Sequence, residues 1–498
     1  MRCYDVAIVG AGFSGSILAA ILAAQGREVL LLDRGSHPRF AIGESSTPLA
    51  DLILDRLAER YRLPGLAAMA RYGRWKKDLP HLMCGAKRGF SYFQHTPGQA
   101  YHDTPDHRRS LLVTASPSQS AADTHWMRSD VDAYLVQLAN GSGVEYRPQT
   151  EIEAAELDAT WHLVLRSHTP DASGTWQAQA DFIIDASGGA AFAKTFLGVA
   201  DATSQLRTHT RAVYGHLNGV PSWSESLRSE GWLDADDPFD ADDAAQHHLL
   251  ADGWLWMLRF DDGRTSVGRS WHGQAPSSVA AAECESSLAS AFGVEAYPAL
   301  QAALATARCV APETGLMRTG RLQHRSAAIA GQSWALLPTA AATLDPLHST
   351  GIAHGLSGVQ RLAAILTADL SERATGLARY AIEVDREVRF ADALVACSYA
   401  MLGDFERFAI STMLYFVAAI DCEERYAAGE VSPCLWSTDN AALMTVIRDS
   451  LSALRDPSLS TERLQRQLAQ QLQPWNKARL LDPAAQHRYR YTAAKKSG

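Results

Sequence analysis

A glycine-rich turn near the N-terminus has the spacing that cradles a phosphate group. Residues 10–15 read GAGFSG, a GxGxxG pattern, between a predicted buried strand at 4–9 and a predicted helix at 14–25. Glycine permits the tight turn and lets a pyrophosphate approach the helix N-terminus, where main-chain amides favour an anion. The turn predicts a dinucleotide site, with a ligand-free glycine turn as the alternative. The predicted cofactor-binding residues here are Gly10, Gly12, Phe13, Ser14 and Gly15.

A carboxylate follows where the ribose of such a dinucleotide would be bound. A second strand is predicted at 28–33 and ends in Asp33, 18 residues after Gly15. A carboxylate at this position can accept hydrogen bonds from ribose hydroxyls. Strand, helix and acidic residue in register make the dinucleotide interpretation much stronger than the glycine pattern alone. Arg34 follows directly and belongs to the predicted cofactor site.

A lysine lies within a glycine-rich and aromatic stretch at residues 84–93. Lys87 is flanked by two glycines and followed by two phenylalanines and a tyrosine. A lysine is by default a solvated surface charge. Among aromatic walls, a desolvated lysine can instead act as a directed donor or as a nucleophilic amine. We therefore treat Lys87 as the candidate catalytic residue, in a stretch (84–98) whose glycines predict loops over a site.

Two further groups of residues have a pattern that suggests a site. Trp254 and Trp256 alternate on a predicted strand, so both rings lie on one face, where they pack in the core or line a passage. Ser349, Thr350 and Gly351 precede a helix-like run, and their amides form a ready anion site. None of the 17 histidines has metal-ligand spacing, so we predict no metal.

The bulk composition excludes several classes of protein. The 498 residues are 47% hydrophobic and 20% charged, which is typical of an ordered globular chain that can bury a cofactor. A formal charge of −9, from 46 basic and 55 acidic residues, argues against a nucleic-acid-binding surface. The seven cysteines are scattered without a CxxC pair, which indicates neither disulfides nor zinc.

Neither export nor a membrane span is predicted. The N-terminus enters a strand at Tyr4 without the charged-then-apolar order of a signal peptide. The most apolar late stretch, residues 408–420, is shorter than the roughly 20 residues that cross a bilayer. We interpret it as a buried helix, with a surface for a lipid or carrier-bound substrate as the alternative. A cytoplasmic location is expected.

The elements that must position these residues follow an α/β order. After the first βαβ unit, the pattern predicts a helix at 131–138 and strands at 144–146, 161–166 and 181–185. Strands dominate from about 212 to 271, as in a sheet that covers a substrate. After residue 337 the apolar spacing is helical to about residue 481.

Beyond the second strand, the chain resembles the bacterial flavin-dependent halogenases, in particular their phenol-type class. Residues 43–48, GESSTP, resemble the GExxxP segment beside the flavin, and residues 84–93 resemble the segment that presents the active-site lysine. Residues 124–132 are similar to the segment whose arginine faces FAD, and residues 183–188 and 336–351 to the second and third FAD fingerprints. The resemblance adds these residues to the cofactor site: Glu44, Ser45, Arg128, Asp185, Gly188, Asp345 and Pro346.

Two segments depart from the family pattern. The halogenase motif WxWxIP reads WLWMLR at residues 254–259, so Leu258 and Arg259 replace the Ile-Pro pair. Arg259 is the best support for a related monooxygenase. Pro338 and Thr339 replace the Gly-Asp pair of many FAD hydroxylases, a variant that phenol-type halogenases tolerate.

The resemblance implies an FAD-dependent halogenase of a two-component system. A flavin reductase supplies FADH₂, O₂ and halide give hypohalous acid, and Lys87 positions that acid by a hydrogen bond or as a haloamine. The substrate is an electron-rich aromatic, phenol- or pyrrole-like, free or carrier-bound. Trp254 and Trp256 line the passage, and Ser349, Thr350 and Gly351 hold the halide or a flavin oxygen.

Two other functions compete with halogenation. An FAD-dependent monooxygenase would hydroxylate a phenol or a protein tryptophan side chain, and the mass of the product separates it from a halogenase. A non-catalytic FAD-binding protein would lack oxygen reactivity in its reduced form.

The same resemblance implies an α/β fold with three parts. These are a GR2-type, Rossmann-like FAD-binding domain, a mixed β-sheet substrate layer and a C-terminal helical region. We expect residues 1–360 to form the FAD-binding, monooxygenase-like domain, with the substrate-covering sheet inserted at about 200–330. Residues 361–498 should form the helical region.

Overall fold

The N-terminal βαβ unit forms as the sequence predicts. The structure, a computed structural model, describes residues 2–169, 173–231, 236–273 and 287–490. β1 (Arg2–Val9) and β2 (Val29–Leu32) pair in parallel, and α1 (Phe13–Ala24) connects them. β2 is buried along its whole length, as expected for a strand whose parallel sheet is covered on both faces.

A mixed seven-stranded sheet carries this unit. Its further strands are β7 (Glu145–Arg147), β8 (Thr150–Leu157), β9 (Trp161–Ser167), β10 (Gly174–Asp185) and β18 (Trp334–Leu336). The order is β7-β2-β1-β10-β9-β8, and β18 pairs with β10. β10 is antiparallel to β9 in its first half and parallel to β1 and β18 further on. The carboxyl ends of β1, β2 and β10 therefore meet at one edge, where such sheets bind nucleotides.

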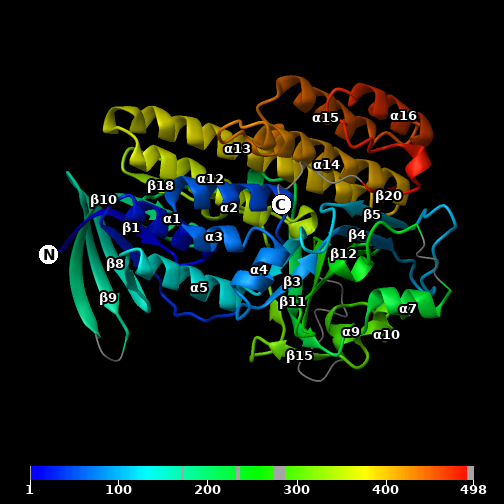
Figure 1. The fold of residues 1–498 in the computed structure, drawn as a ribbon, viewed down its shortest axis with the longest axis horizontal. Coiled ribbons are helices and arrows are strands. Elements are labelled where there is room, and N and C mark those ends of the chain that lie inside the picture. Colours follow the sequence, from blue (N-terminus) through cyan, green and yellow to red (C-terminus); the bar gives the residue numbers. More distant parts are fainter. Residues whose placement is uncertain (1, 170–172, 232–235, 274–286, 491–498) are drawn as a thin grey trace.

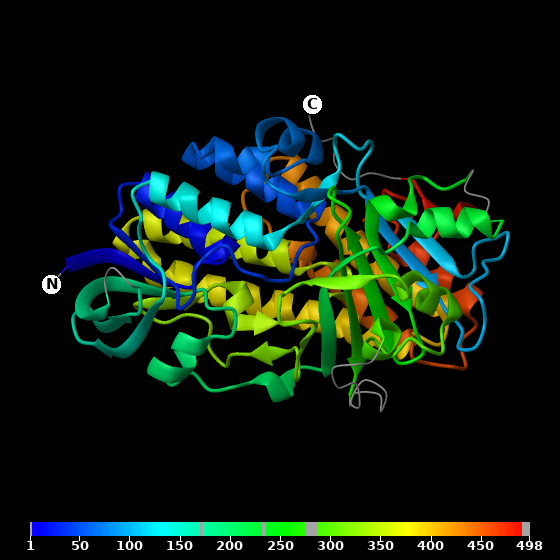
Figure 2. The ribbon, with the colours of Figure 1, turned by 90° about the horizontal axis from the view of Figure 1, so that it is seen from below.

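A nine-stranded sheet forms the other half of the molecule (Figure 2). Its order is β15-β11-β14-β13-β12-β4-β5-β20, and β16 pairs with β11. The bounds are β4 (Gly89–Gln94), β5 (Ser110–Thr114), β11 (Thr210–Asn218), β12 (Ala244–Leu249), β13 (Gly253–Arg259), β14 (Thr265–His272), β15 (Arg308–Ala311), β16 (Met317–Arg318) and β20 (Arg488–Tyr489). The predicted limits of about 200–330 are therefore too narrow. β4 pairs in parallel with β12, and β20 with β5, so strands that precede and follow residues 200–330 complete the sheet.

The glycine-rich stretch at 84–98 contains two strands where the sequence predicted loops. β3 (Cys84–Lys87) pairs with β6 (Asp123–Trp126), and β4 follows after one residue. A β-carbon at Gly85 would lie 1.9 Å from the carbonyl oxygen of Arg259, and one at Gly89 would lie 2.2 Å from that of Val113. These glycines thus mark close approach of neighbouring backbones, which is a common role of glycine within strands.

Helices pack on one face of the first sheet and extend over the second (Figure 1). Their bounds are α2 (Pro48–Tyr61), α3 (Pro64–Ala68), α4 (Tyr72–Asp78), α5 (Arg128–Gly141), α6 (Ala191–Phe196), α7 (Trp223–Ser229), α9 (Leu288–Ala291), α10 (Pro298–Leu304), α11 (Pro338–Ala341), α12 (Gly351–Thr367), α13 (Leu370–Ala400), α14 (Phe405–Ala427), α15 (Ala441–Ala453) and α16 (Thr461–Gln471). The boundary predicted at residue 360 falls inside α12, because the helical region starts at Gly351. That region is not purely helical, since it ends in β20.

The apolar stretch at 408–420 lies in α14, and all its residues are buried. α14 contacts α2, α13 and α15, so protein covers its apolar surface. The interpretation as a buried helix is therefore confirmed. No helix within the described ranges is long and apolar enough to cross a membrane.

Candidate functional site: a cavity at the carboxyl edge of the first sheet

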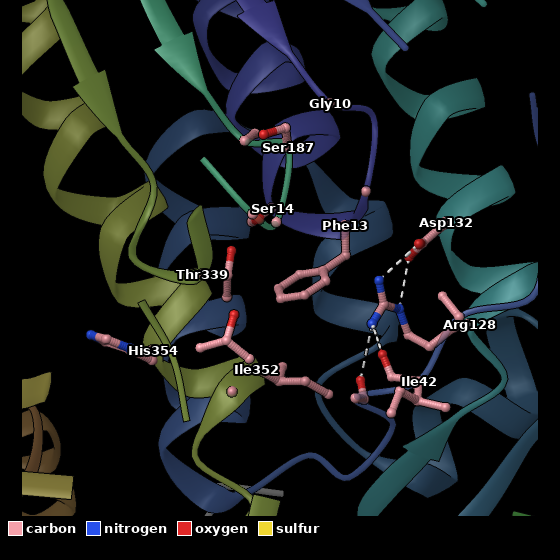
Figure 3. Close-up of a pocket in the computed structure, with 18 of the residues that line it drawn as sticks. Gly10, Phe13, Ser14, Ile42, Arg128, Asp132, Ser187, Thr339, Ile352 and His354 are labelled. Atoms are coloured by element: carbon pink, nitrogen blue, oxygen red, sulfur yellow. Dashed lines mark hydrogen bonds and ion pairs between the residues drawn. The ribbon is translucent and has the colours of Figure 1, made fainter. Parts of the chain in front are cut away.

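A cavity of about 1040 Å³ lies at the edge where β1, β2 and β10 end. Its wall comes from the turns after β1 and β10, the segment after β2, and the starts of α5 and α12, while β12 and β13 contribute from the second sheet. Figure 3 shows part of this wall. The predicted residues that line it are Gly10, Gly12, Phe13, Ser14, Asp33, Arg34, Glu44, Ser45, Arg128, Gly188, Trp254, Trp256, Asp345, Pro346, Ser349, Thr350 and Gly351.

The glycine turn leaves space for a pyrophosphate. Gly10 has a φ of 114°, which residues with a side chain rarely adopt. Gly12 has an ordinary φ of −73°, and among the described residues a β-carbon there would meet only Arg128 Nη2, at 4.0 Å. The protein's own packing therefore does not require glycine at position 12. The free space beside it fits the pyrophosphate of FAD, which must approach the backbone closely.

Asp33 is buried at the end of β2 and held as an anion. Its carboxylate accepts hydrogen bonds from both terminal nitrogens of Arg39, at 2.5 and 2.8 Å, and from the amides of Ala11 and Gly35, each at 2.8 Å. Burial favours a higher pKa for this carboxyl, but Arg39 and the two amides outweigh burial and hold the pKa below its ordinary value. Asp33 thus fixes the glycine turn while it lines the cavity.

Arg128 presents a fixed positive charge to the cavity (Figure 3). Its Nε and Nη2 donate to the carboxylate of Asp132 at 2.9 and 2.8 Å, and its Nη1 donates to the carbonyl of Ile42 at 2.7 Å. The guanidinium carbon lies 4.9 Å from the centre of the Phe13 ring. A guanidinium held in this way suits an anionic cofactor, because its fork geometry is already fixed before the cofactor binds.

The segment after β2 connects the cavity with the second sheet and with α12. Glu44 was expected beside the flavin, and it does line the cavity, but its carboxylate lies 2.5 Å from His216 Nε2 of β11. Both side chains are nearly inaccessible, at 1% and 3% exposure. The next residue, Ser45, has its hydroxyl 3.0 Å from that of Ser349. Ser45 and Ser349 therefore form a polar pair at the start of α12.

The two tryptophans of β13 line the cavity on one face, as predicted, with ring centroids 5.6 Å apart. The indole nitrogen of Trp254 lies 3.2 Å from Asp345 Oδ1 and 3.0 Å from the Tyr399 hydroxyl. Burial raises the pKa of Asp345, and hydrogen bonds to its carboxylate oppose the rise. Asp345, predicted to bind the cofactor, thus uses its carboxylate to hold the cavity wall. The hydroxyls of Thr210, Ser270 and Tyr399 also lie within hydrogen-bond distance of the Asp345 carboxylate.

Lys87 is completely buried at the end of β3 and is not part of the cavity wall. Its Nζ donates to the carbonyl oxygen of Ser46 at 2.6 Å and lies 3.8 Å from the centre of the Phe90 ring. The environment is therefore the desolvated, aromatic one that the sequence predicted, and the surface-charge alternative is excluded. Ser46 directly follows Ser45, so one peptide unit links the lysine to the cavity wall.

Gly15 and Asp185, both predicted to bind the cofactor, do not line the cavity. A β-carbon at Gly15 would lie 2.1 Å from the carbonyl oxygen of Gly10, so this glycine allows α1 to pack against the turn. Asp185 accepts hydrogen bonds from the amides of Ser187 and Ala193, each at 2.9 Å, and so shapes the turn that carries Gly188. Both residues therefore stabilise turns that form the cavity wall, although they do not line the cavity themselves.

The departure at Arg259 lies outside the cavity. Its Nε donates to Asp242 at 2.9 Å and its Nη1 to the carbonyl of Val220 at 3.2 Å. Leu258 lines the cavity, whereas Arg259 does not. The arginine therefore leaves the wall unchanged, and it no longer supports a different chemistry. Thr339, at the second departure, does line the cavity.

Sequence reasoning missed Arg39 and His247, which both line the cavity. A signal for Arg39 was its position six residues after Asp33, with which it forms an ion pair. A signal for His247 was period-two alternation, which separates it from His248 onto opposite faces of β12. Nothing in the local pattern indicated which of the two histidines would line the cavity.

No group of three or more His, Cys, Asp or Glu side chains in the described part of the chain is arranged to hold a metal ion. Of the seven cysteines, Cys284 lies outside the described residues, and the other six are free thiols: Cys3, Cys84, Cys309, Cys397, Cys422 and Cys434.

Comparison with known proteins agrees with this site. A model of the FAD binding domain family matches residues 3–232. The chain is 29% identical over 384 residues to tetracycline 7-halogenase of Kitasatospora aureofaciens, across 76% of this chain and 66% of that protein. It is 27% identical over 456 residues to monodechloroaminopyrrolnitrin halogenase PrnC of Pseudomonas fluorescens, across 88% and 76% of the two chains.

A solved structure has the same fold over almost its whole length. The crystal structure of halogenase PltM in complex with phloroglucinol and FAD superposes with a TM-score of 0.78 at 25% identity, covering 98% of this chain and 99% of that one. Fold, cavity and family model together define an FAD-dependent enzyme. In sequence and in fold the chain is similar to flavin-dependent halogenases.

Proposed function

We propose that the protein halogenates an electron-rich aromatic substrate with a halide, O₂ and reduced FAD. The observation that carries this proposal is the completely buried Lys87, whose Nζ donates to Ser46, the residue next to Ser45 of the cavity wall. Burying a lysine side chain costs free energy, so a completely buried lysine indicates a specific role. The net reaction replaces an aromatic hydrogen by halogen, reduces O₂ to water and oxidises the reduced FAD.

The residues at the cavity fit FAD. Gly12 would give the pyrophosphate access to the turn before α1, Asp33 would lie near the ribose, and Arg128 would supply a fixed cation. When bound, the reduced cofactor would supply the two-electron activation of O₂ by which a halide becomes hypohalous acid. The cavity wall then has to hold the halide and keep bulk water out.

The start of α12 is the proposed halide position. Ser349 and Ser45 present their hydroxyls to each other at 3.0 Å, and Thr350 and Gly351 begin a 17-residue helix at the cavity. The first amides of a helix have no partner within it and carry partial positive charge, so they favour an anion. Because Ser349 donates to Ser45, the Ser45 hydroxyl keeps its own proton as a further donor to the anion.

The aromatic face of the second sheet is the proposed dry passage. Trp254 and Trp256 line the cavity and exclude water, which would otherwise divert hypohalous acid. Lys87 lies behind this face. It either donates a hydrogen bond that directs the oxidant or forms a haloamine, in which Nζ–H and HO–halogen give Nζ–halogen and water. Either role places the halogen where an aromatic carbon can attack it.

Several partners complete the proposed system. A separate flavin reductase supplies FADH₂, and chloride or bromide is the co-substrate. The aromatic substrate is phenol- or pyrrole-like, free or carrier-bound. The PrnC halogenase and the phloroglucinol complex of PltM support this substrate class. A cytoplasmic location suits a protein with scattered, unpaired cysteines and a cytosolic source of reduced flavin.

Mass spectrometry tests the proposal directly. The enzyme is incubated with a panel of phenols and pyrroles, a flavin reductase, NADH, FAD and either chloride or bromide. We expect product with the halogen isotope pattern, dependent on halide, O₂ and reductase. Hydroxylated product without halogen would establish the monooxygenase function instead, and no oxygen reactivity of the reduced flavin would favour a non-catalytic role.

A further inference from the structure

His247 lies at the boundary between the cavity and the interior that contains Lys87. It is on β12, it lines the cavity, and only 2% of its surface is exposed. Its ring stacks on Trp254 at a centroid distance of 5.0 Å and on Tyr92 at 4.4 Å, with interplanar angles of 28° and 20°. The imidazole is therefore one of a stack of rings that separates the cavity from the interior.

The ring of Phe90 lies near both this stack and the lysine. The Phe90 ring lies 6.1 Å from the His247 ring, at an interplanar angle of 23°. Lys87 Nζ lies 3.8 Å from the centre of the same Phe90 ring. The parallel pairing of β12 with β4 fixes these distances, because it places His247 opposite Tyr92. His247 is thus the cavity-lining polar group that the ring contacts connect to Lys87.

The chemistry of this imidazole suits a small neutral acid. Nδ1 lies 3.2 Å from the carbonyl oxygen of Ser91, and since a carbonyl only accepts, Nδ1 carries the proton. Burial lowers the pKa of His247 to about 3, the Ser91 carbonyl opposes this, and the charge of Lys87 adds to it. The ring is then neutral near pH 7, with its lone pair at Nε2.

We propose that His247 is a positioning residue of the halogenation reaction, whose Nε2 accepts the O–H hydrogen bond of hypohalous acid and directs the acid from the cavity toward Lys87. The inference rests on the proposed function. No bond is made or broken at His247. Its neutral imidazole provides a hydrogen-bond acceptor beside the tryptophan rings, so the oxidant is retained instead of escaping through the cavity into solvent.

The adjacent His248 provides a matched control. It lies on the opposite face of β12, is completely buried and does not line the cavity. Its Nδ1 lies 3.0 Å from His95 Nε2, and its ring packs edge-on against Trp223 at 4.7 Å. The two histidines share a strand and near-complete burial, but only His247 can meet an oxidant in the cavity.

The test compares the variants His247→Asn, His247→Gln and His248→Asn in the reductase-coupled reaction. Asn retains a donor near Nδ1, whereas Gln places a polar atom near Nε2. The measured quantity is the ratio of halogenated product to hypohalous acid captured by a soluble scavenger, for each reduced flavin oxidised. FAD affinity, measured by flavin fluorescence without turnover, reports whether the cavity is intact.

We expect His247→Asn to lower the ratio about tenfold, which corresponds to one lost hydrogen bond to a neutral group, while FAD affinity stays unchanged. His247→Gln should recover part of the ratio, and His248→Asn should leave it as in the unsubstituted protein. An unchanged ratio in His247→Asn, or an equal fall in His248→Asn, would overturn the inference alone. If the unsubstituted protein produced neither halogenated product nor captured hypohalous acid, the proposed function would fail, and this inference with it.

Discussion

Lys87 Nζ donates a hydrogen bond of 2.6 Å to the main-chain oxygen of Ser46, the residue directly after a serine of the cavity wall. The lysine is therefore positioned by the same segment that runs along the proposed flavin site. Because that segment also contacts Ser349 through Ser45, a shift at the start of α12 would reach Lys87 through one peptide unit. The proposed halide position and the lysine are therefore connected through this segment.

Replacement of Lys87 by alanine should eliminate halogenated product while FAD binding and oxidation of reduced flavin persist. The lysine is not in the cavity wall, so it should act after the oxidant forms and before the substrate is attacked. Loss of a directed donor or amine commonly costs about 10²–10³-fold in turnover. Flavin occupancy, peroxide release and product are measured side by side.

A second variant separates chemistry from packing in this test. Lys87→Met preserves most of the buried volume, whereas Lys87→Ala leaves a cavity that destabilises the core. We expect both variants to lose product equally. Full halogenation in either variant would remove Lys87 from the mechanism, and unchanged hydroxylation would favour the monooxygenase.

Two glycines of the same turn should respond to substitution in opposite ways. Gly12→Val should abolish FAD binding with little effect on the flavin-free protein, because a side chain there enters the cavity and meets little of the protein itself. Gly15→Ala should instead destabilise the fold by about 1–3 kcal/mol, since its β-carbon meets the Gly10 carbonyl. Flavin titration and thermal melting of the flavin-free proteins distinguish the effects. Normal flavin content in Gly12→Val would show that the pyrophosphate lies elsewhere.

The protein should not accept electrons directly from NADPH. The sequence has one dinucleotide fingerprint, at residues 10–15, and FAD accounts for it. We expect bound FAD to stay oxidised for minutes under anaerobic conditions with NADPH or NADH, and to become reduced only through a reductase. Flavin absorbance in a stopped-flow instrument measures this. Rapid reduction by NADPH alone would contradict the two-component arrangement.

Local rules predicted the first βαβ unit, the buried helix α14 and the shared face of the two tryptophans. In each of these the pattern that decides the structure lies within about twenty residues of sequence, as strand and helix periodicities do. The same rules predicted loops around Gly85 and Gly89, where the structure has strands. Their partners are the backbones of Arg259 and Val113, and a close approach to a distant strand leaves no local mark.

The contacts that define the site join residues that are far apart in the chain. Lys87 meets Ser46 across 41 residues, and Glu44 meets His216 across 172. Resemblance to a family located such residues at the site, but it did not provide their partners. Glu44 and Asp345 were expected to bind the cofactor, and the structure adds that their carboxylates contact other side chains. The parallel addition of β20 to β5 was likewise invisible to any local pattern.

Because of a buried ion pair next to the cavity, the free energy of unfolding should fall at acid pH. Glu387 accepts from Arg361 Nη2 at 2.5 Å and lies 3.4 Å from Nε2 of His354, a residue of the cavity wall. Burial favours a higher pKa for Glu387, but Arg361 and His354 outweigh it and lower the pKa to about 2. Because the folded pKa lies below the unfolded value, the stabilisation is complete above about pH 4.5 and is lost as pH falls toward 2.

The expected loss from this group between pH 7 and pH 4 is roughly 1 kcal/mol of unfolding free energy. Glu387→Gln should lower stability at pH 7 and flatten this part of the pH dependence. Glu383 is the matched control, since it contacts the same arginine from the same helix, yet burial raises its pKa. Glu383→Gln should therefore not flatten the acid limb. Urea unfolding at several pH values measures both, and parallel curves for Glu387→Gln and the unsubstituted protein would contradict the assignment.

The hydroxyl of Tyr399 should hold the Trp254 ring in place along the proposed passage. It lies 3.0 Å from the indole nitrogen of Trp254 and donates to Ser270 or Asp345 at 2.8 and 2.9 Å. Tyr399→Phe removes an acceptor from Trp254 and a donor from Asp345, so the ring that lines the cavity is held less firmly. A net contribution of about 1 kcal/mol for one hydrogen bond corresponds to a roughly fivefold effect.

We therefore expect Tyr399→Phe to lower the ratio of halogenated product to scavenged hypohalous acid about fivefold without weakening FAD binding. Tyr380→Phe is the control, because Tyr380 is buried on the same helix but donates to the carbonyl of Leu336 at 2.7 Å, away from Trp254. The control should lose a similar amount of stability with no change in the ratio. An equal fall of the ratio in both variants would mean that a general loss of rigidity in α13 lets hypohalous acid escape. A fall confined to Tyr399→Phe would mean that the Tyr399 contact with Trp254 keeps the oxidant in the passage.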